Sequence, residues 1–279
     1  MSFDRRVLSV AVAALSLAFA ARGLAADDAA EKARKKLEKK EIRFRAKEFI
    51  EAVESGEMDV IDLFLTAGMD VNGKGSYGNT ALHVAASNEN AKVMARLLKA
   101  KPDVNALNDQ KRTPLYESVH SGQLSRGKNT LPLLIGAGAD LKIRYRYGQT
   151  IVHEAVDNDN PDALQILIKA GAEVDAKDEH GKTPLFEAAG LRPKLVPILT
   201  AAGANPNARE SPQGETALMS AANVGEAESI KALLKAGADA KATDSQGTTA
   251  LHYAARMNRA SMQSLKIPES QYVETIQAL

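Results

Sequence analysis

The sequence predicts an all-α solenoid of paired antiparallel helices, and two regularities carry that prediction. Six threonines follow one another at steps of 33, 37, 33, 33 and 33 residues, and each opens a similar tetrapeptide such as TALH or TPLF. A glycine that ends an apolar run precedes five of them by 12 or 13 residues. A fixed period near 33 residues is typical of repeat proteins, which stack small units around one continuous core. The threonines are Thr80, Thr113, Thr150, Thr183, Thr216 and Thr249, and the glycines are Gly68, Gly138, Gly171, Gly203 and Gly237.

Each unit is expected to contain a helix that begins at the threonine, a short turn, a second helix, a glycine stop and an exposed extended loop. Threonine suits a helix start because its hydroxyl accepts a free backbone N–H. Pro114 and Pro184 stand at the next position, where a missing N–H costs nothing. Glycine past the second helix fits a left-handed cap, and Lys101 takes its place in one copy.

These units resemble the ankyrin repeat, whose signature is T-P-L-H-x-A-A followed by L-L-x-x-G-A-D-x-N. The best copies are Thr80–Ala86 and Thr249–Ala255, and the resemblance covers roughly residues 44 to 270. It implies an ankyrin-repeat solenoid with inter-repeat β-hairpin loops and about six to seven units, including atypical end caps. It also implies a structural role for the fourth residue of the tetrapeptide, which is His83, His153 or His252 in three copies.

The first 25 residues have the layout of a secretory signal peptide. Arg5 and Arg6 precede an apolar stretch, Val7 to Ala21, and a small-x-small cleavage site predicts processing after Ala25. A membrane anchor is the alternative, but about 15 apolar residues fall short of the roughly 20 that span a bilayer. We therefore expect export to the bacterial periplasm, with secretion as the alternative, and the sequence leaves open Sec or twin-arginine transport.

Residues 26–43 form a charged N-terminal helix or linker before a repeat domain over residues 44–279. Nine Lys or Arg and two acids lie between Lys32 and Lys47. A cap helix that docks Leu37 and Phe44 on the first repeat is favoured over a helix lying on anionic lipid. Without residues 1–25 the chain keeps 33 basic and 34 acidic residues, a balance that argues against general nucleic-acid binding. It has no cysteine, which excludes a lipidated cysteine and disulfide bonds.

Motifs of catalysis are weak throughout. Ala176–Thr183 fits a relaxed phosphate loop, but it is also an ordinary inter-repeat hairpin, and Asp178 and Glu179 would place negative charge beside the phosphates. Gly73–Gly78 fits G-x-G-x-x-G, but it lies in another inter-repeat loop where no parallel-sheet strand is evident. His153 and Glu154 begin a sequence like that of a zinc-binding helix, but Asp157 stands where the second histidine would be. We therefore expect no enzyme activity, no cofactor and no metal site.

The expected partner surface lies on the loop tips and on the first helices. One tip, Lys142–Gly148, brings two tyrosines and two arginines together, and these residue types dominate binding hot spots. The alternative is that these tyrosines stack on adjacent tips, with Tyr77 or Tyr116 packing in a similar way. The predicted binding residues are Tyr77, Arg112, Arg144, Tyr145, Arg146, Tyr147 and His180 on the tips, with Ser87, His120 and Asp157 on the helices.

These features predict a non-enzymatic, monomeric protein-binding module that inhibits, chaperones or holds another exported protein, whose identity the sequence does not give. One alternative is a role in haem handling or peroxide stress, because some small exported ankyrin proteins to which this chain is similar have that association. Another is a secreted effector that binds host proteins. An insertion over residues 122–129 accounts for the 37-residue step, and its role stays open.

Overall fold

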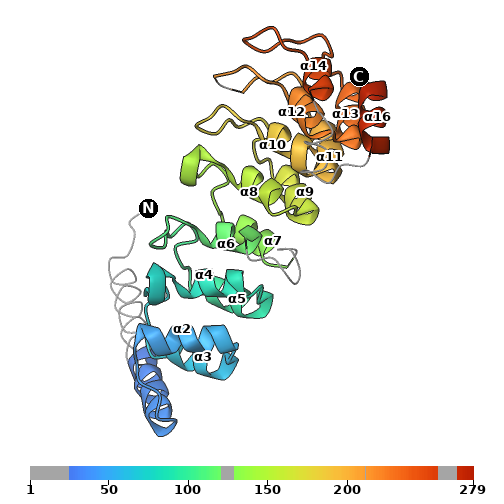
Figure 1. Ribbon diagram of the computed structural model, residues 1–279. Helices are drawn as coiled ribbons and strands as arrows, with labels where there is room; N and C mark the ends of the chain where they lie inside the picture. Colours follow the sequence, from blue (N-terminus) through green and yellow to red (C-terminus); the bar gives the residue numbers. More distant parts are fainter. Residues whose placement is uncertain (1–24, 121–128, 211, 257–268) are drawn as a thin grey trace, which may run out of the picture.

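The structure, a computed structural model, is a stack of helix pairs with loops projecting from one side (Figure 1). It describes residues 25–120, 129–210, 212–256 and 269–279. The expected signal peptide up to residue 24 and most of the 122–129 insertion lie outside the described residues. The first helices are α2 (Ala46–Ser55), α4 (Ala81–Ser87), α6 (Pro114–His120), α8 (Ile151–Asp157), α10 (Pro184–Leu191), α12 (Ala217–Val224) and α14 (Ala250–Ala255). Their partners are α3 (Met58–Thr66), α5 (Ala91–Leu98), α7 (Leu131–Gly136), α9 (Pro161–Lys169), α11 (Val196–Ala201), α13 (Ala227–Lys235) and α16 (Glu269–Ala278).

The threonines cap the first helices as the spacing predicted. Thr80, Thr150 and Thr249 each form a capping box with the histidine three residues later. The Thr150 N–H donates to Nδ1 of His153 at 3.1 Å, and Nε2 of that ring lies 3.2 Å from the carbonyl oxygen of Lys182 in the next unit. The histidine therefore fixes its own helix start and fastens the neighbouring loop to it, as the resemblance implied.

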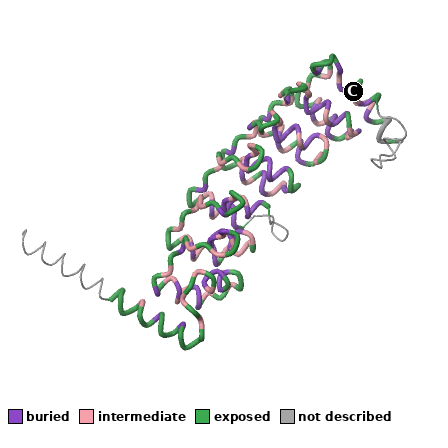
Figure 2. The backbone as a smooth tube through the Cα atoms, turned by 60° about the vertical axis from the view of Figure 1, so that its left-hand side comes forward, coloured by how far each residue is buried: buried purple, intermediate pink, exposed green. Residues whose placement is uncertain are grey.

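The buried side chains form one cluster that runs through the stack from Ala33 to Ala254. Figure 2 shows buried positions in the helices of each unit along the stack. The units that begin at Thr80, Thr183 and Thr216 each contribute the leucine of the tetrapeptide and two following alanines, for example Leu82 with Ala85 and Ala86, all buried. Small side chains let successive helices approach closely, so every unit depends on its neighbours for burial.

Each threonine is preceded by a tight loop tip that one backbone hydrogen bond closes. We number these tips 1 to 6, over residues 75–79, 108–112, 145–149, 178–182, 210 with 212–215, and 244–248. In each, the N–H of the first residue donates to the carbonyl oxygen of the last, at 2.8 to 3.0 Å. The expected hairpins are short, since the described residues hold only two isolated antiparallel bridges, Lys74 to Thr80 and Arg209 to Thr216. Tips 1 and 3 include the 3-10 turns η1 (Ser76–Gly78) and η2 (Arg146–Gly148), and η3 (Pro193–Leu195) precedes α11.

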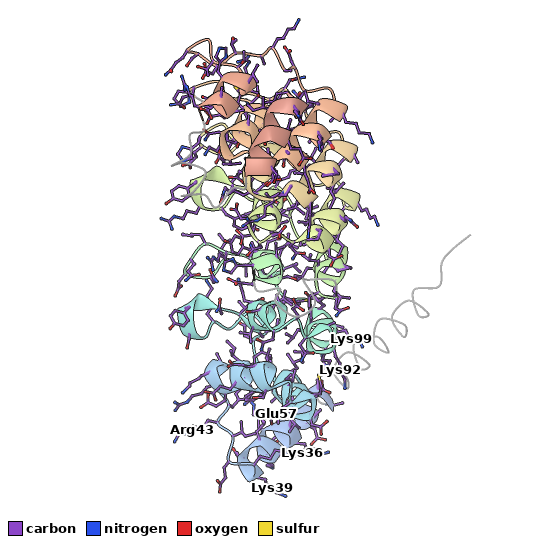
Figure 3. All side chains as sticks on the ribbon, turned by 45° about the vertical axis from the view of Figure 1, so that its right-hand side comes forward. Lys36, Lys39, Arg43, Glu57, Lys92 and Lys99 are labelled. Carbon is purple, nitrogen blue, oxygen red and sulfur yellow. The ribbon has the colours of Figure 1, made fainter. Side chains whose placement is uncertain are left out.

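The end of the stack is covered by a helix over residues 25–39. Ala33 and Leu37 of that helix are buried, and Arg34 donates to the carbonyl oxygen of Ala67. Phe44 stacks on Phe64 with ring centroids 5.8 Å apart. The apolar side of this helix thus packs on the first unit, while side chains such as Lys36 and Lys39 face solvent (Figure 3).

Candidate functional site: the inner face

The face between the loop tips and the first helices, here called the inner face, is hollowed at three places. The first hollow, about 390 Å³, lies between α2, tip 1 and α4 and includes Tyr77 and Ser87. The second, about 520 Å³, lies between tips 2 and 3 and the helices α6 and α8. The third, about 350 Å³, lies between α8, α10 and α12 and includes the exposed side chain of Leu191.

Aromatic rings and guanidinium groups form the walls of the second hollow. The Tyr116 ring lies 4.7 Å from the Tyr145 ring and 5.4 Å from the His120 ring, measured between centroids. The guanidinium of Arg112 lies 4.7 Å above Tyr116, and that of Arg146 lies 4.5 Å above Tyr147. Such rings and guanidiniums offer large contact area together with polar groups, which suits non-covalent recognition.

Carboxylates line the helices beneath these rings. Glu117, Glu154 and Glu187 hold the same position in three successive units, one residue after the end of the tetrapeptide. Oε1 of Glu154 accepts a hydrogen bond from Nδ1 of His120 at 2.6 Å, which links α6 to α8. Burial raises the pKa of Glu117, although the nearby Arg112 opposes the rise. The row therefore places acidic side chains on the helices beneath the basic Arg112 and Arg146 of tips 2 and 3.

Asp157 and Glu187 share one neutral partner. The side-chain amide of Gln149 donates to Asp157 and to Glu187, at 3.3 Å in each case. Burial, followed by repulsion from Glu154, raises the pKa of Asp157. Burial, followed by repulsion from Asp157 and Asp178, raises the pKa of Glu187 to about 8. Neither carboxylate forms an ion pair with any residue in the described part of the chain.

The structure gathers most of the predicted binding residues in the second hollow. Its lining includes Arg112, His120, Tyr145, Arg146, Tyr147 and Asp157. Tyr77 and Ser87 line the first hollow instead, and the side chain of Tyr77 is 75% exposed, the largest exposure among the big apolar side chains described. His180 lies beside the second hollow, with its ring centroid 6.4 Å from that of Tyr147.

Two predicted binding residues, Tyr145 in tip 3 and Arg144 just before it, are less free than expected. Tyr145 is partly buried, and its hydroxyl lies 2.8 Å from Oγ1 of Thr113, so it packs on the neighbouring unit as the alternative interpretation predicted. Nη1 of Arg144 donates to the carbonyl oxygens of Gly148 and Lys177, at 2.9 and 2.7 Å. Both side chains are held by the fold, which leaves Arg146 and Tyr147 as the exposed pair of that tip.

Tyr116, Gln149 and Glu154 also line the second hollow and were not predicted. The repeat register could have indicated two of them. Tyr116 stands at the histidine position of the tetrapeptide, and Glu154 occupies the same repeat position as Glu117, 37 residues earlier. Within the described ranges, no three His, Asp or Glu side chains are placed to hold a metal ion. Over those same residues, no helix is both long and apolar enough to cross a membrane.

Comparison with known proteins agrees with this architecture. The family described as ankyrin repeats (three copies) matches residues 49–126, 124–210 and 190–269. A solved structure of the ankyrin repeat domain of Bcl-3, a member of the IkappaB family, has a TM-score of 0.67 at 26% identity and covers 78% of this chain and 97% of that one. The human ASB11 ankyrin repeat domain has a TM-score of 0.63 at 25% identity and covers 78% and 96%.

Two relatives share sequence with part of the chain. The Nuclear factor NF-kappa-B p105 subunit of Gallus gallus is 34% identical over 159 residues, which are 56% of this chain and 16% of that protein. A putative ankyrin repeat-containing protein of Treponema pallidum (strain Nichols) is 31% identical over 109 residues, 39% of this chain and 35% of that protein. The chain thus spans well under two thirds of the length of either relative.

Proposed function

Because the chain belongs to the ankyrin-repeat family, whose repeats generally mediate protein–protein interaction, we propose that it is a non-enzymatic module that binds another exported protein in the bacterial periplasm. The observation that carries this proposal is the second hollow. Three exposed or partly exposed side chains from two tips, Arg112, Arg146 and Tyr147, border it, and the acids of α8 line it. Binding there would inhibit or chaperone the partner.

The periplasmic location rests on the N-terminal sequence alone. A basic start, an apolar stretch and a small-x-small site support export and processing after Ala25. Cell fractionation followed by N-terminal sequencing tests this. A periplasmic chain that begins at Ala26 would support it, and an unprocessed cytoplasmic chain would refute it.

Haem handling has less support from the geometry. Tyr145 and His153, two of the ligands that a haem site could use, are engaged in hydrogen bonds to Thr113 and to Thr150. Binding to host proteins after secretion would use the same inner face, so the partner captured decides between that alternative and a periplasmic one.

Affinity capture from a periplasmic extract tests the site. Residues 26–279 serve as bait beside an Arg146→Ala/Tyr147→Ala variant, which leaves the buried Tyr145 in place. A Lys92→Ala/Lys99→Ala variant is the matched control, because both lysines are exposed on the opposite side of the stack (Figure 3). We expect one protein to be retained by the native chain and by the control and to be lost by the tip variant. Equal retention by all three would refute the site.

A further inference from the structure

Neighbouring tips are fastened by a repeated side-chain link that is missing at one junction. Lys74 donates to the carbonyl oxygen of Leu107 at 2.9 Å, which joins tips 1 and 2. Arg144 joins tips 3 and 4, Lys177 joins tips 4 and 5, and Arg209 joins tips 5 and 6 in the same way. Between tips 2 and 3 the corresponding side chain is that of Leu107, which is 40% exposed and cannot donate.

A backbone link between tips is missing at the same place. The N–H of Asp109 donates to the carbonyl oxygen of Tyr77, that of Glu179 to Tyr147 and that of Ser245 to Gln213, at 2.8 to 3.0 Å. The equivalent groups between tips 2 and 3 are the N–H of Arg146 and the carbonyl oxygen of Gln110. Neither has a hydrogen-bond partner among the described residues.

The other junction that lacks a backbone link is between tips 4 and 5. Counted back from the following threonine, Pro212 stands in tip 5 at the donor position, and proline has no N–H. That junction keeps its side-chain link through Lys177. Among the described residues, therefore, the junction between tips 2 and 3 alone lacks both links.

The missing links affect only the ends of tips 2 and 3, because the chain segments next to these tips remain hydrogen-bonded to each other. The N–H of Asp140 donates to Oδ1 of Asn105 at 2.9 Å, and the hydroxyls of Thr113 and Tyr145 lie 2.8 Å apart. The second hollow, which includes Gln110 and Arg146 in its lining, lies at this junction. An unpaired donor and an unpaired acceptor on facing loops are what an added extended strand would pair with.

We propose that an extended segment of the partner enters between tips 2 and 3, accepts a hydrogen bond from the Arg146 N–H, donates one to the Gln110 carbonyl oxygen and places a lysine or arginine side chain beside Asp157. The basic residue follows from charge complementarity at Asp157, an exposed carboxylate that lines the second hollow and accepts a side-chain hydrogen bond from the neutral amide of Gln149. The rings of Tyr116 and Tyr145 would pack against its alkyl stem. This inference rests on the proposed binding function and names the kind of segment bound.

Proline substitution separates the backbone contact from the side-chain contact at position 146. Arg146→Ala removes the guanidinium and keeps the N–H, whereas Arg146→Pro removes both. Tyr145 has φ −98° and ψ −159°, an extended conformation outside the α region that a following proline disfavours, and Arg146 begins the η2 turn, where proline is tolerated. Equal thermal unfolding midpoints for the two variants show that the proline variant folds.

The probe is a phage-displayed library of random twelve-residue peptides, selected on residues 26–279. We expect enriched peptides to carry Lys or Arg and to bind the proline variant about two- to tenfold more weakly than the alanine variant, the effect of one hydrogen bond. Selection on an Asp157→Asn variant should lose the preference for Lys and Arg. Equal affinity for the proline and alanine variants, or no enrichment of basic peptides on the native chain, would overturn the inference. Capture of a natural partner through Arg146 and Tyr147 would still support the proposed function in either case.

Discussion

The carboxyl group of Glu187 makes the stability of this fold depend on pH, and the dependence can be measured. Glu187 lies on α10 at the edge of the third hollow. Its Oε1 accepts one hydrogen bond from Gln149, and its Oε2 is buried without a partner in the described part of the structure. Burial and the repulsion from Asp157 and Asp178 raise its pKa to about 8. A buried carboxylate without compensation is costly, so the folded state favours the protonated form.

The sign follows from proton counting. Below the ordinary pKa of 4.5, Glu187 is protonated in both the folded and the unfolded chain. Between that pH and about 8, the folded chain holds a proton that the unfolded chain has lost, so the free energy of unfolding falls as the pH rises. The ceiling for this loss is about 5 kcal/mol at about 1.4 kcal/mol per pH unit. Local relaxation and water entry reduce it, and we expect roughly 1–3 kcal/mol.

Glu187→Gln tests this reasoning, because the amide keeps the shape and removes the titration. Urea unfolding at pH 5 and pH 9 gives the free energy of unfolding for both proteins. The variant should exceed the native chain by roughly 1–3 kcal/mol more at pH 9 than at pH 5. Glu173→Gln removes an exposed carboxylate from the loop after α9 and controls for net charge. A variant-minus-native difference that is the same at both pH values would refute the assignment.

Three further substitutions test the links within and between repeats by urea unfolding. Lys101 has φ +54°, so Lys101→Gly should stabilise the fold by about 0.5–1 kcal/mol, whereas Ala100→Gly, outside the left-handed region, should not. His153→Ala removes a fully buried ring and its hydrogen bond to the Lys182 carbonyl oxygen, so it should lower the free energy of unfolding by about 2–4 kcal/mol. The control His252→Ala changes an exposed histidine and should lower it by about 1 kcal/mol or less. Leu107→Lys should supply the missing donor between tips 2 and 3, add up to about 1 kcal/mol and weaken peptide binding; unchanged stability and binding would count against the open junction.

The regular part of this fold follows from the sequence because its causes are local. A threonine hydroxyl caps its own helix, and a glycine past a helix adopts a left-handed conformation, as at Gly68 with φ +85°. The register then places Ser87, His120 and Asp157 on the inner face without knowledge of any contact. The position of a residue relative to the threonine of its repeat is therefore enough to predict whether it lies on the side of the first helix that faces the tips.

The direction of long side chains in the tips does not follow from spacing. Tyr145 and Arg144 have the residue types of a binding hot spot, yet one packs on Tyr116 and the other joins tips 3 and 4. Whether such a side chain points outward depends on the acceptors that the neighbouring tip presents. The role of Leu107 was missed for the same reason. It matters because its side chain has no hydrogen-bond donor, whereas the equivalent side chain before tip 1, that of Lys74, donates to the next loop.

In a solenoid, stability is approximately a sum of terms within units and between neighbouring units, so the junction with the fewest links should open first. Here that junction lies between tips 2 and 3, where Leu107 replaces a basic donor and Tyr116 replaces the bridging histidine. Amide hydrogen exchange tests this directly, because an N–H without a partner exchanges without any opening of the structure. We expect the Arg146 amide to exchange fastest, while the amides of Asp109 and Glu179, which donate to the preceding tips, are protected. Slowed exchange at Arg146 on addition of a selected basic peptide would place that peptide between the tips. Protection of Arg146 equal to that of Glu179 in the free protein would show instead that the junction is closed in solution.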